Sequence, residues 1–334
     1  VVLDHVGVDV RVALHAGGID HELQAVAGEK LLGGDHTSSG VDHTGGALIC
    51  KGDPTFNRIT KYIQQMPASD FKGETFYLRL HSKDGYQVFS PFFVPTLTKL
   101  DKFECRVGLG YTRIVSEYSG IRTDVTIFVP NGESCEIRDF KIKNISHNDI
   151  IVDAIPVVEY THPDALKQFT NADWIPQTMQ SRCKKHDGKT VLLQYPFMFK
   201  KTKVNYFTAS HPVSSFETDR KLFLGENEYG TWRSPLRLLA DQLSNSQAER
   251  GDNISALLLS LGTLSPGESR RFSTILGQEQ SMKQVLPVIR KYCKPENVDS
   301  AFRELGDFWA DYLSVQQVET PDPSMNAMLN VHNP

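Results

Sequence analysis

The sequence lacks a dominant charge and any long hydrophobic run. Its 334 residues include 36 Lys and Arg against 40 Asp and Glu, so the formal net charge of −4 provides no basic field for nucleic acid. No apolar run approaches the roughly 20 residues that a transmembrane helix requires, and the longest, residues 256–261, has the length of a strand. We therefore expect neither nucleic acid nor a membrane among the partners of this protein.

Cysteines are few, and the motifs of common catalytic sites are missing. The five cysteines are widely scattered, and none belongs to a CxxC pair. This pattern favours reduced thiols in a cytoplasmic protein over a disulfide framework or a zinc site. The sequence also contains no GxSxG, HExxH or phosphate-cradling glycine loop. The residues alone therefore assign no catalytic group, metal or organic cofactor.

The beginning of the chain lacks aromatic residues. The first 55 residues contain no Phe, Tyr or Trp, although the whole chain is 10% aromatic. Four Asp-His pairs begin at Asp4, Asp20, Asp35 and Asp42. Both residue types bind first-row metals, but the pairs share no helical or strand spacing that would bring them to one ion. We predict that residues 1–46 form a poorly ordered leader that binds no metal.

A run of strand patterns occupies residues 107–144. Val125 and Ile127 lie two positions apart, the period of a strand with two different faces. Residues 130–132 (Pro-Asn-Gly) then interrupt the run, since Asn-Gly tolerates the positive φ angles of a tight hairpin. The alternation resumes at Phe140. The pattern predicts three or four consecutive antiparallel strands.

Strand patterns continue to about residue 276, and then the period changes. One apolar helix face is marked by residues at spacings of four, three, four and three: Val298, Phe302, Leu305, Trp309 and Tyr312. Two prolines within residues 320–324 end this helix. We predict a mainly β fold with a large antiparallel β-sandwich over residues 47–278, an α-helical linker over 279–322 and the start of another helix at 323–334.

Five segments carry a family resemblance: FNRITKY (56–62), FYLRL with KDGYQVFSP (76–91), GYTRIVSEYSGIRTDVTIFVPNGESCEIRDFKIKN (110–144), LSPGE (264–268) and FWADYLSVQQVETPDPSMNAMLNVHNP (308–334). In this order they resemble the N-terminal half of glycoside hydrolase family 94, the inverting disaccharide phosphorylases of the cellobiose, cellodextrin and chitobiose type. The similarity begins near Ala47 and covers the chain to its end, whereas nothing in residues 1–46 matches the family.

The resemblance implies a β-supersandwich, linker helices and then an (α/α)6 catalytic barrel, which is expected beyond Pro334. Members cleave a β-glucosidic bond with inorganic phosphate as co-substrate and release an α-sugar 1-phosphate, which makes them glycosyltransferases of carbohydrate metabolism. One carboxylic acid of the barrel protonates the glycosidic oxygen while phosphate attacks from the opposite face, so the second carboxylate of an inverting hydrolase is not needed. The resemblance implies no metal or organic cofactor. It also implies a homodimer of the full-length protein, in which a sandwich loop reaches the partner's active site.

We expect no catalytic residue in this chain and three substrate-binding candidates. Arg58 and Lys61 lie in a basic loop flanked by aromatic residues, which would help to shape a sugar site; the alternative is a surface loop with Arg58 in a local ion pair. Trp174, like Trp232, offers a flat ring on which a sugar can stack. The alternative for both tryptophans is ordinary packing at the rim of the sandwich.

Two stretches with acidic residues can each be interpreted either as catalytic or as an ordinary surface loop or turn. Glu159, Asp164 and Asp173 form the best carboxylate cluster, and a hydrolase needs two carboxyl groups about 5–10 Å apart. Acids in a polar loop are more often solvated, so we favour that interpretation. Residues 225–228 (Gly-Glu-Asn-Glu) are typical of a turn.

Two functional classes remain. The first is the sandwich and linker of a disaccharide phosphorylase, inactive alone, and the second is a stand-alone β-sandwich that binds a β-linked glucoside without chemistry. The start of a third helix after Pro323 favours the first. In that case we expect the apolar stripe at Val298, Phe302, Leu305 and Trp309 to lack part of its partner surface.

Overall fold

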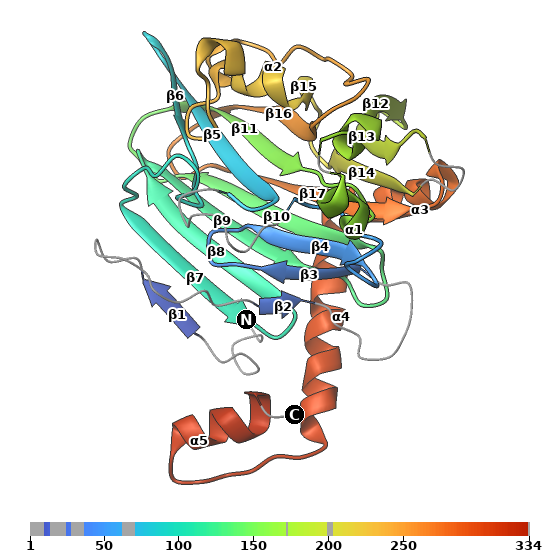
Figure 1. Cartoon of the computed structure of the whole chain (residues 1–334). Helices are drawn as coiled ribbons and strands as arrows, with labels where there is room; N and C mark the ends of the chain where they lie inside the picture. Colours follow the sequence, from blue (N-terminus) through green and yellow to red (C-terminus); the bar gives the residue numbers. More distant parts are fainter. Residues whose placement is uncertain are drawn as a thin grey trace.

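The computed structural model describes residues 10–13, 25–27, 37–61, 71–171, 173–198 and 203–332. Two large antiparallel sheets stack face to face, and helices and loops cover their outer faces (Figure 1). The nine-stranded sheet has the order β1 (Val10–Ala13), β7 (Lys102–Gly108), β8 (Tyr111–Tyr118), β9 (Ile121–Phe128), β10 (Cys135–Asn144), β17 (Ser269–Glu279), β14 (Val204–Ala209), β13 (Lys189–Pro196) and β12 (Met179–His186). The five-stranded sheet has the order β15 (Ser215–Asp219), β16 (Asn253–Leu264), β11 (Ile150–Glu159), β5 (Glu74–Ser82) and β6 (Gly85–Phe89). The mainly β sandwich predicted from the sequence is confirmed.

The strand run predicted for residues 107–144 forms the middle of the larger sheet. Strands β8, β9 and β10 pair in sequence order, each antiparallel to the one before. Gly132 adopts a φ of +77° in the turn before β10, in keeping with the predicted hairpin chemistry. Sequence-adjacent pairing of this kind explains why local periodicity was sufficient to find these strands.

An aromatic group joins the two large sheets at their centre. Phe76 of β5 contacts Phe140 of β10 with ring centroids 4.5 Å apart, and Phe140 stacks on Phe272 of β17 at 4.8 Å. All three rings are buried in the cluster that fills the space between the sheets. Burial of each such side chain stabilises the fold by about 1.5–3 kcal/mol.

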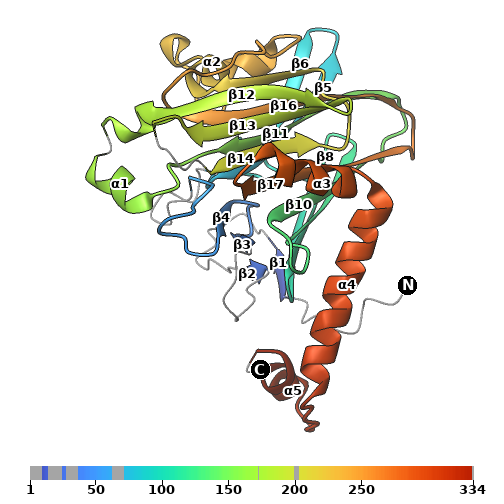
Figure 2. The same cartoon turned by 90° about the vertical axis from the view of Figure 1, so that its right-hand side faces the viewer.

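The outer face of the nine-stranded sheet is apolar too, and two helices cover it (Figure 2). These are α3 (Met282–Tyr292) and α4 (Pro295–Ser314). Val285 and Ile289 of α3, and Val298 and Leu305 of α4, are buried against strands β9, β10, β13, β14 and β17. Gly110, in the turn between β7 and β8, leaves space that Trp309 and Leu305 fill: a Cβ there would lie 2.8 Å from Trp309 Nε1.

The prediction that the helix stripe lacks a partner surface is therefore wrong for Val298 and Leu305, because the outer face of the sheet supplies that surface. Phe302 packs edge-on against Tyr111 at 5.3 Å, and Trp309 joins the same cluster. The exposed apolar side chains of α4 lie one position away from the stripe or further along it, at Phe308 and Tyr312.

The far half of α4 projects from the sandwich and leads to α5 (Pro323–Ala327) and a short π-helical turn, η4 (Met328–His332), both away from the sheets (Figures 1 and 2). Asp322 caps α5 by accepting a hydrogen bond from the Ser324 amide at 2.8 Å. Asn330 binds back to Val318 through two side-chain hydrogen bonds. Among the described residues, no helix has the length and apolar character needed to cross a membrane.

Part of the predicted leader packs into the fold. A three-stranded sheet joins β2 (Ala25–Ala27), β3 (Thr37–Val41) and β4 (Ala47–Lys51), and Val41 is completely buried. Residues 37–46 therefore differ from the poorly packed segment that we expected, because Val41 is buried in the core and the Ser39 hydroxyl donates to Glu136 of β10. Most of residues 1–36 lie outside the described residues, including the Asp-His pairs at Asp4, Asp20 and Asp35. The carboxylate of Asp42 closes a turn by accepting hydrogen bonds from Thr44 and Gly46.

The contact between β3 and β10 is a buried ionic cluster. Arg138 of β10 pairs with Glu136 at 2.7 Å and with Glu74 of β5, and it donates to the Gly45 carbonyl at 2.8 Å. The Ser39 hydroxyl donates to Glu136. One guanidinium thus faces two carboxyl groups. Burial, opposed by Arg138 and reinforced by Glu136, raises the pKa of Glu74 well above its usual value.

This raised pKa predicts a pH dependence of stability. The folded protein holds the Glu74 proton more tightly than the unfolded chain does, so the free energy of unfolding falls as pH rises from about 4.3 toward the raised pKa. Glu74→Gln removes this titration, and the stability of the wild type relative to that variant should decrease with pH in urea unfolding series. Glu117→Gln, in a partly exposed ion pair with Arg122, is the control. A relative stability of the wild type that increases with pH would contradict the assignment.

Candidate functional site

Two loops that contain most of the predicted site residues run side by side at one end of the sandwich. The backbone amide of Lys61 donates to the Glu159 carbonyl at 2.8 Å, and the Arg58 amide donates to the Pro163 carbonyl at 3.2 Å. A third bond joins Ala165 to Thr55 at 2.8 Å. Residues 53–61 are therefore fixed against the loop that follows β11.

The three substrate-binding candidates do not converge. Lys61 Nζ lies 3.0 Å from Glu159 Oε1 in an ion pair. Arg58 Nε is buried and makes no hydrogen bond within the described part of the chain. Trp174 lies beyond α1 (Ala165–Thr170), where it precedes the 3-10 helix η1 (Ile175–Thr178) and is 47% exposed. Sugar binding by any of these three residues stays a prediction.

The three acids of the predicted carboxylate cluster have separate roles. Asp164 caps α1 by accepting a hydrogen bond from the Lys167 amide at 2.9 Å. Asp173 is exposed in a turn. Glu159 is buried at the end of β11, where burial raises its pKa against the opposing effects of Lys61 and Arg220. The ordinary interpretation of Asp164 and Asp173 therefore holds, and Glu159 belongs to an ion-pair network.

This network leads from Lys61 to a second group of residues. Arg220 Nε lies 3.3 Å from Glu159 Oε1, so one carboxylate joins Lys61 and Arg220. The Arg220 guanidinium also pairs with Glu226 Oε1 at 3.2 Å and with Asp252 Oδ2 at 3.3 Å. Arg220 begins the short helix α2 (Arg220–Leu224), which Asp219 caps through the amides of Lys221 and Leu222. The network therefore fixes α2 to the end of the five-stranded sheet.

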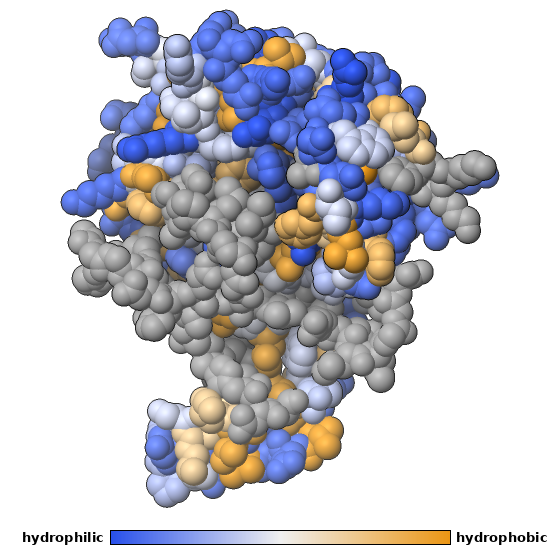
Figure 3. All heavy atoms as spheres, in the orientation of Figure 1, coloured by the Kyte–Doolittle hydropathy of each residue, from blue (hydrophilic) through white to orange (hydrophobic). Residues whose placement is uncertain are grey.

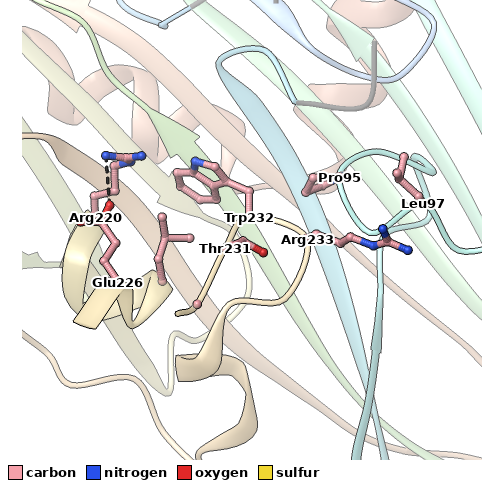
Figure 4. A pocket seen from close by; sticks show the side chains of 9 residues that line it. Pro95, Leu97, Arg220, Glu226, Thr231, Trp232 and Arg233 are labelled. Atoms are coloured by element: carbon pink, nitrogen blue, oxygen red, sulfur yellow. Dashed lines mark ion pairs between the residues drawn. The ribbon is translucent and has the colours of Figure 1, made fainter. Parts of the chain in front are cut away.

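Arg220 lines a pocket of about 380 Å3 on the outer side of the five-stranded sheet (Figure 4). One wall comes from residues 220–233, and the other comes from Pro95 and Leu97 in the loop after β6. Trp232 belongs to the first wall. Figure 4 shows Arg220 and Glu226 on one side of its ring and Arg233 on the other. The pocket thus combines an indole surface with two guanidinium groups, a carboxylate and the Thr231 hydroxyl.

Two glycines allow the chain to close this wall. Gly225 ends α2 in the left-handed conformation with a φ of +75°, and its carbonyl accepts a hydrogen bond from the Gly230 amide at 2.9 Å. The backbone of Gly230 passes so close to Leu224 that a Cβ at this position would lie 1.5 Å from the Leu224 carbonyl oxygen. The turn predicted for residues 225–228 is present, and it contains the 3-10 helix η2 (Glu226–Glu228).

Sequence reasoning singled out Trp232, interpreted the stretch containing Glu226 as a turn, and missed Arg220 and Arg233. Arg220, Glu226 and Arg233 follow no helical or strand period, and the chain brings them together only because residues 220–245 fold back over the sheet. Tyr77 and Ile155 on that sheet pack against Phe223 and Leu238 of the covering segment. The one local signal was the closeness of Trp232 to several charged residues within a stretch rich in turn residues.

Two stacked antiparallel sheets, covered by helices on the outside of the larger one, define a β-sandwich of the supersandwich kind. Residues 26–295 match the family model described as "Glycosyl hydrolase 94, supersandwich domain", and the chain belongs to this family. The family resemblance found in the sequence is thereby confirmed. The match begins at residue 26, so the boundary of the family segment lies earlier than the predicted residue 47.

Several curated relatives are phosphorylases that are much longer than this chain. The N,N'-diacetylchitobiose phosphorylase of Vibrio proteolyticus is 27% identical over 304 residues, which are 90% of this chain and 36% of that protein. The solabiose phosphorylase of Paenibacillus borealis is 24% identical over 88% of this chain and 37% of its own length. This chain thus spans a little over a third of each of these two relatives.

A solved structure supports the fold alone. A bacterial glucoamylase in complex with acarbose superposes with a TM-score of 0.53 at 10% sequence identity. The superposition covers 92% of this chain and 40% of the glucoamylase. At this identity the likeness concerns the arrangement of sheets and helices.

Gly230 provides a test of how the pocket wall is built. In Gly230→Ala the new methyl group would overlap the Leu224 carbonyl, so residues 224–230 must move, and we expect a loss of about 2 kcal/mol or more in the free energy of unfolding. Gly40→Ala is the matched control, because no atom lies within 4 Å of its Cβ position; its change should stay within about 0.5 kcal/mol. Equal urea midpoints for the two variants would show that the close approach is absent.

Proposed function

We propose that this chain is the sandwich and linker part of an inverting disaccharide phosphorylase. Such an enzyme cleaves a β-glucosidic bond with inorganic phosphate and yields an α-sugar 1-phosphate. The observation that carries the proposal is the family match over residues 26–295, together with phosphorylase relatives of which this chain spans a little over a third. Inorganic phosphate is the proposed co-substrate, without a metal or an organic cofactor.

The chemistry of phosphorolysis supports the assignment of an accessory role to this chain. An inverting displacement needs an acid on one face of the scissile bond and a phosphate pocket on the other, held in register. In the described residues, Glu159 is engaged with Lys61 and Arg220, and Asp164 caps a helix. Neither is placed as an acid opposite an anion pocket. We therefore propose that an (α/α)6 barrel carries the catalytic acid.

We also propose a homodimeric full-length protein in the cytoplasm. The loop containing Arg58 and Lys61 would contribute to a sugar site in the assembly, together with Trp174. The cytoplasmic location is supported by the five cysteines, all of which lie in the described residues without a disulfide between them.

An assay for sugar 1-phosphate tests this function. Cellobiose or N,N'-diacetylchitobiose is incubated with phosphate and either residues 1–334 or a longer protein that continues into a barrel. We expect release of an α-sugar 1-phosphate by the longer protein and none above the blank by residues 1–334. Catalysis requires well over about 8 kcal/mol of transition-state stabilisation, and the acid that we propose to supply it belongs to the barrel. Release by residues 1–334 that Glu159→Gln or Asp164→Asn abolishes would place the catalytic acid in this chain.

The projecting part of α4 predicts self-association of residues 1–334. Phe308 and Tyr312 are 39% and 46% exposed, and Met325 and Met328 are each 52% exposed. Figure 3 shows hydrophobic residues gathered on the protruding part formed by α5 and the end of α4. Apolar groups in such a patch favour association. Sedimentation velocity should show concentration-dependent oligomers that Phe308→Ser with Tyr312→Ser reduces.

The control for this experiment is Phe169→Ser, which removes a ring that is 72% exposed on α1, away from α5 and the end of α4 (Figure 2). It should leave the oligomer distribution unchanged. A monomer at all concentrations, or a loss of oligomers in the Phe169 variant alone, would show that the end of α4 does not mediate self-association.

A further inference from the structure

The pocket beside Trp232 lies entirely within the sandwich, so it can be considered without any other domain. Its volume of about 380 Å3 falls at the lower end of the approximate 300–1,000 Å3 range of small-molecule sites. A pocket of this size accommodates one or two sugar rings. The question is which ligand chemistry its lining fits.

The indole of Trp232 is held in place before any ligand arrives. Phe71 packs edge-on against it at 4.4 Å, and the Arg220 guanidinium carbon lies 6.0 Å from the ring centroid. The Tyr77 hydroxyl of β5 donates a hydrogen bond to the Trp232 carbonyl at 2.6 Å, and this bond fixes the backbone of Trp232 to the sheet. A fixed ring costs little conformational entropy on binding. It offers a flat apolar surface to the C–H face of a sugar.

Polar groups surround this ring on the open sides of the pocket. Glu226 accepts hydrogen bonds, Thr231 both donates and accepts, and Arg233 donates from a planar fork. Arg233 is exposed, and within the described residues no hydrogen bond or ion pair engages its guanidinium. Its donors are therefore available for neighbouring hydroxyl groups of a ligand, without the loss of an internal contact.

The charges around the pocket balance. Lys61, Arg220 and Arg233 supply three positive charges, and Glu159, Glu226 and Asp252 supply three negative ones. Arg220 and Lys61 bind these three carboxylates, and Arg233 offsets the one negative charge that remains, so the six groups have no net charge to attract a phosphate, a carboxylate or a cation. Mixed donors and acceptors with no net charge suit a neutral polyhydroxyl compound.

We propose that this pocket is a binding site for a neutral saccharide. One sugar ring stacks on Trp232, and its hydroxyl groups bond to Glu226, Thr231 and Arg233. The backbone supports this role: Leu97, in the opposite wall, has a positive φ angle of 55°, and such residues cluster at ligand-binding loops. The site does not depend on phosphorolysis by a longer protein, because every group belongs to residues 61–252.

Isothermal titration calorimetry on residues 1–334 tests the proposal. The neutral probes are glucose, cellobiose, N,N'-diacetylchitobiose and a soluble mixed-linkage β-glucan, and the charged probes are glucuronate and glucose 6-phosphate. We expect millimolar binding of at least one neutral probe and weaker binding of both charged ones. A free disaccharide and the end of a glucan chain share the same ring chemistry, and the disaccharide and glucan arms tell them apart.

Three variants locate the ligand. Trp232→Ala should weaken binding by about tenfold, as loss of a central aromatic anchor commonly does, and Arg233→Ala by about threefold to tenfold for lost hydrogen bonds to an ionised donor. Arg233 has no described partner, so its variant should fold normally even if Trp232→Ala does not. Tyr229→Ala is the matched control, because this aromatic side chain belongs to the same loop, is 93% exposed and does not line the pocket.

Three results would overturn the proposal. The first is no binding of any neutral probe, and the second is tighter binding of the charged probes. The third is a loss in Tyr229→Ala equal to that in Arg233→Ala, which would place the sugar on the loop surface. The outcome is separate from that of the phosphorylase assay, since saccharide binding without phosphorolysis would leave the pocket assignment in place.

Discussion

The nine-stranded sheet is apolar on both faces, and most of the structure follows from the need to cover both. On β10, Phe140 faces the five-stranded sheet while Ile137 faces the helices. On β17, Phe272 and Ile275 divide in the same way. A sheet in this position cannot leave either side to water without exposing several large side chains, each at a cost of about 1.5–3 kcal/mol.

This constraint decides which parts of the two helices α3 and α4 belong to the sandwich. The first part of the predicted linker, α3 and the beginning of α4, belongs to the hydrophobic core of the sandwich rather than to a connection between domains. The rest of α4, beyond Trp309, extends away from the sheet. The direction of α4 is accordingly set by the sheet beneath it, through Gly110 and its neighbours Leu305 and Trp309.

Local patterns in the sequence were enough for the elements but not for the pocket. The strands of residues 107–144 alternate and pair with their neighbours in sequence, and the stripe on α4 follows the helical period, so their types and approximate bounds could be predicted. Strand β3 was missed because two of its three buried residues, Thr37 and Ser39, are polar, and Ser39 is held by a hydrogen bond to Glu136 of β10. A search for apolar alternation does not detect burial of that kind.

The candidate site depended on contacts between residues far apart in the chain. Lys61 was proposed for the character of its loop, yet its partner Glu159 lies 98 positions away, and Arg220 lies 61 positions beyond Glu159. No spacing rule connects these three residues. The sheet order β15-β16-β11-β5 brings them together, and that order rests on pairing across long stretches of chain. Only the structure therefore shows that Trp232 and Arg220 share a cavity.

The balance of charge around Trp232 also bears on how fast and how selectively a ligand arrives. Neighbouring charges of both signs with no net charge produce little potential at a distance, and the remainder is screened within about 8 Å at physiological ionic strength. Diffusing molecules are then neither steered toward the cavity nor turned away from it. Discrimination among ligands falls to the short-range fit of ring and hydroxyl groups, and the rate of encounter should be the same in dilute buffer and in concentrated salt.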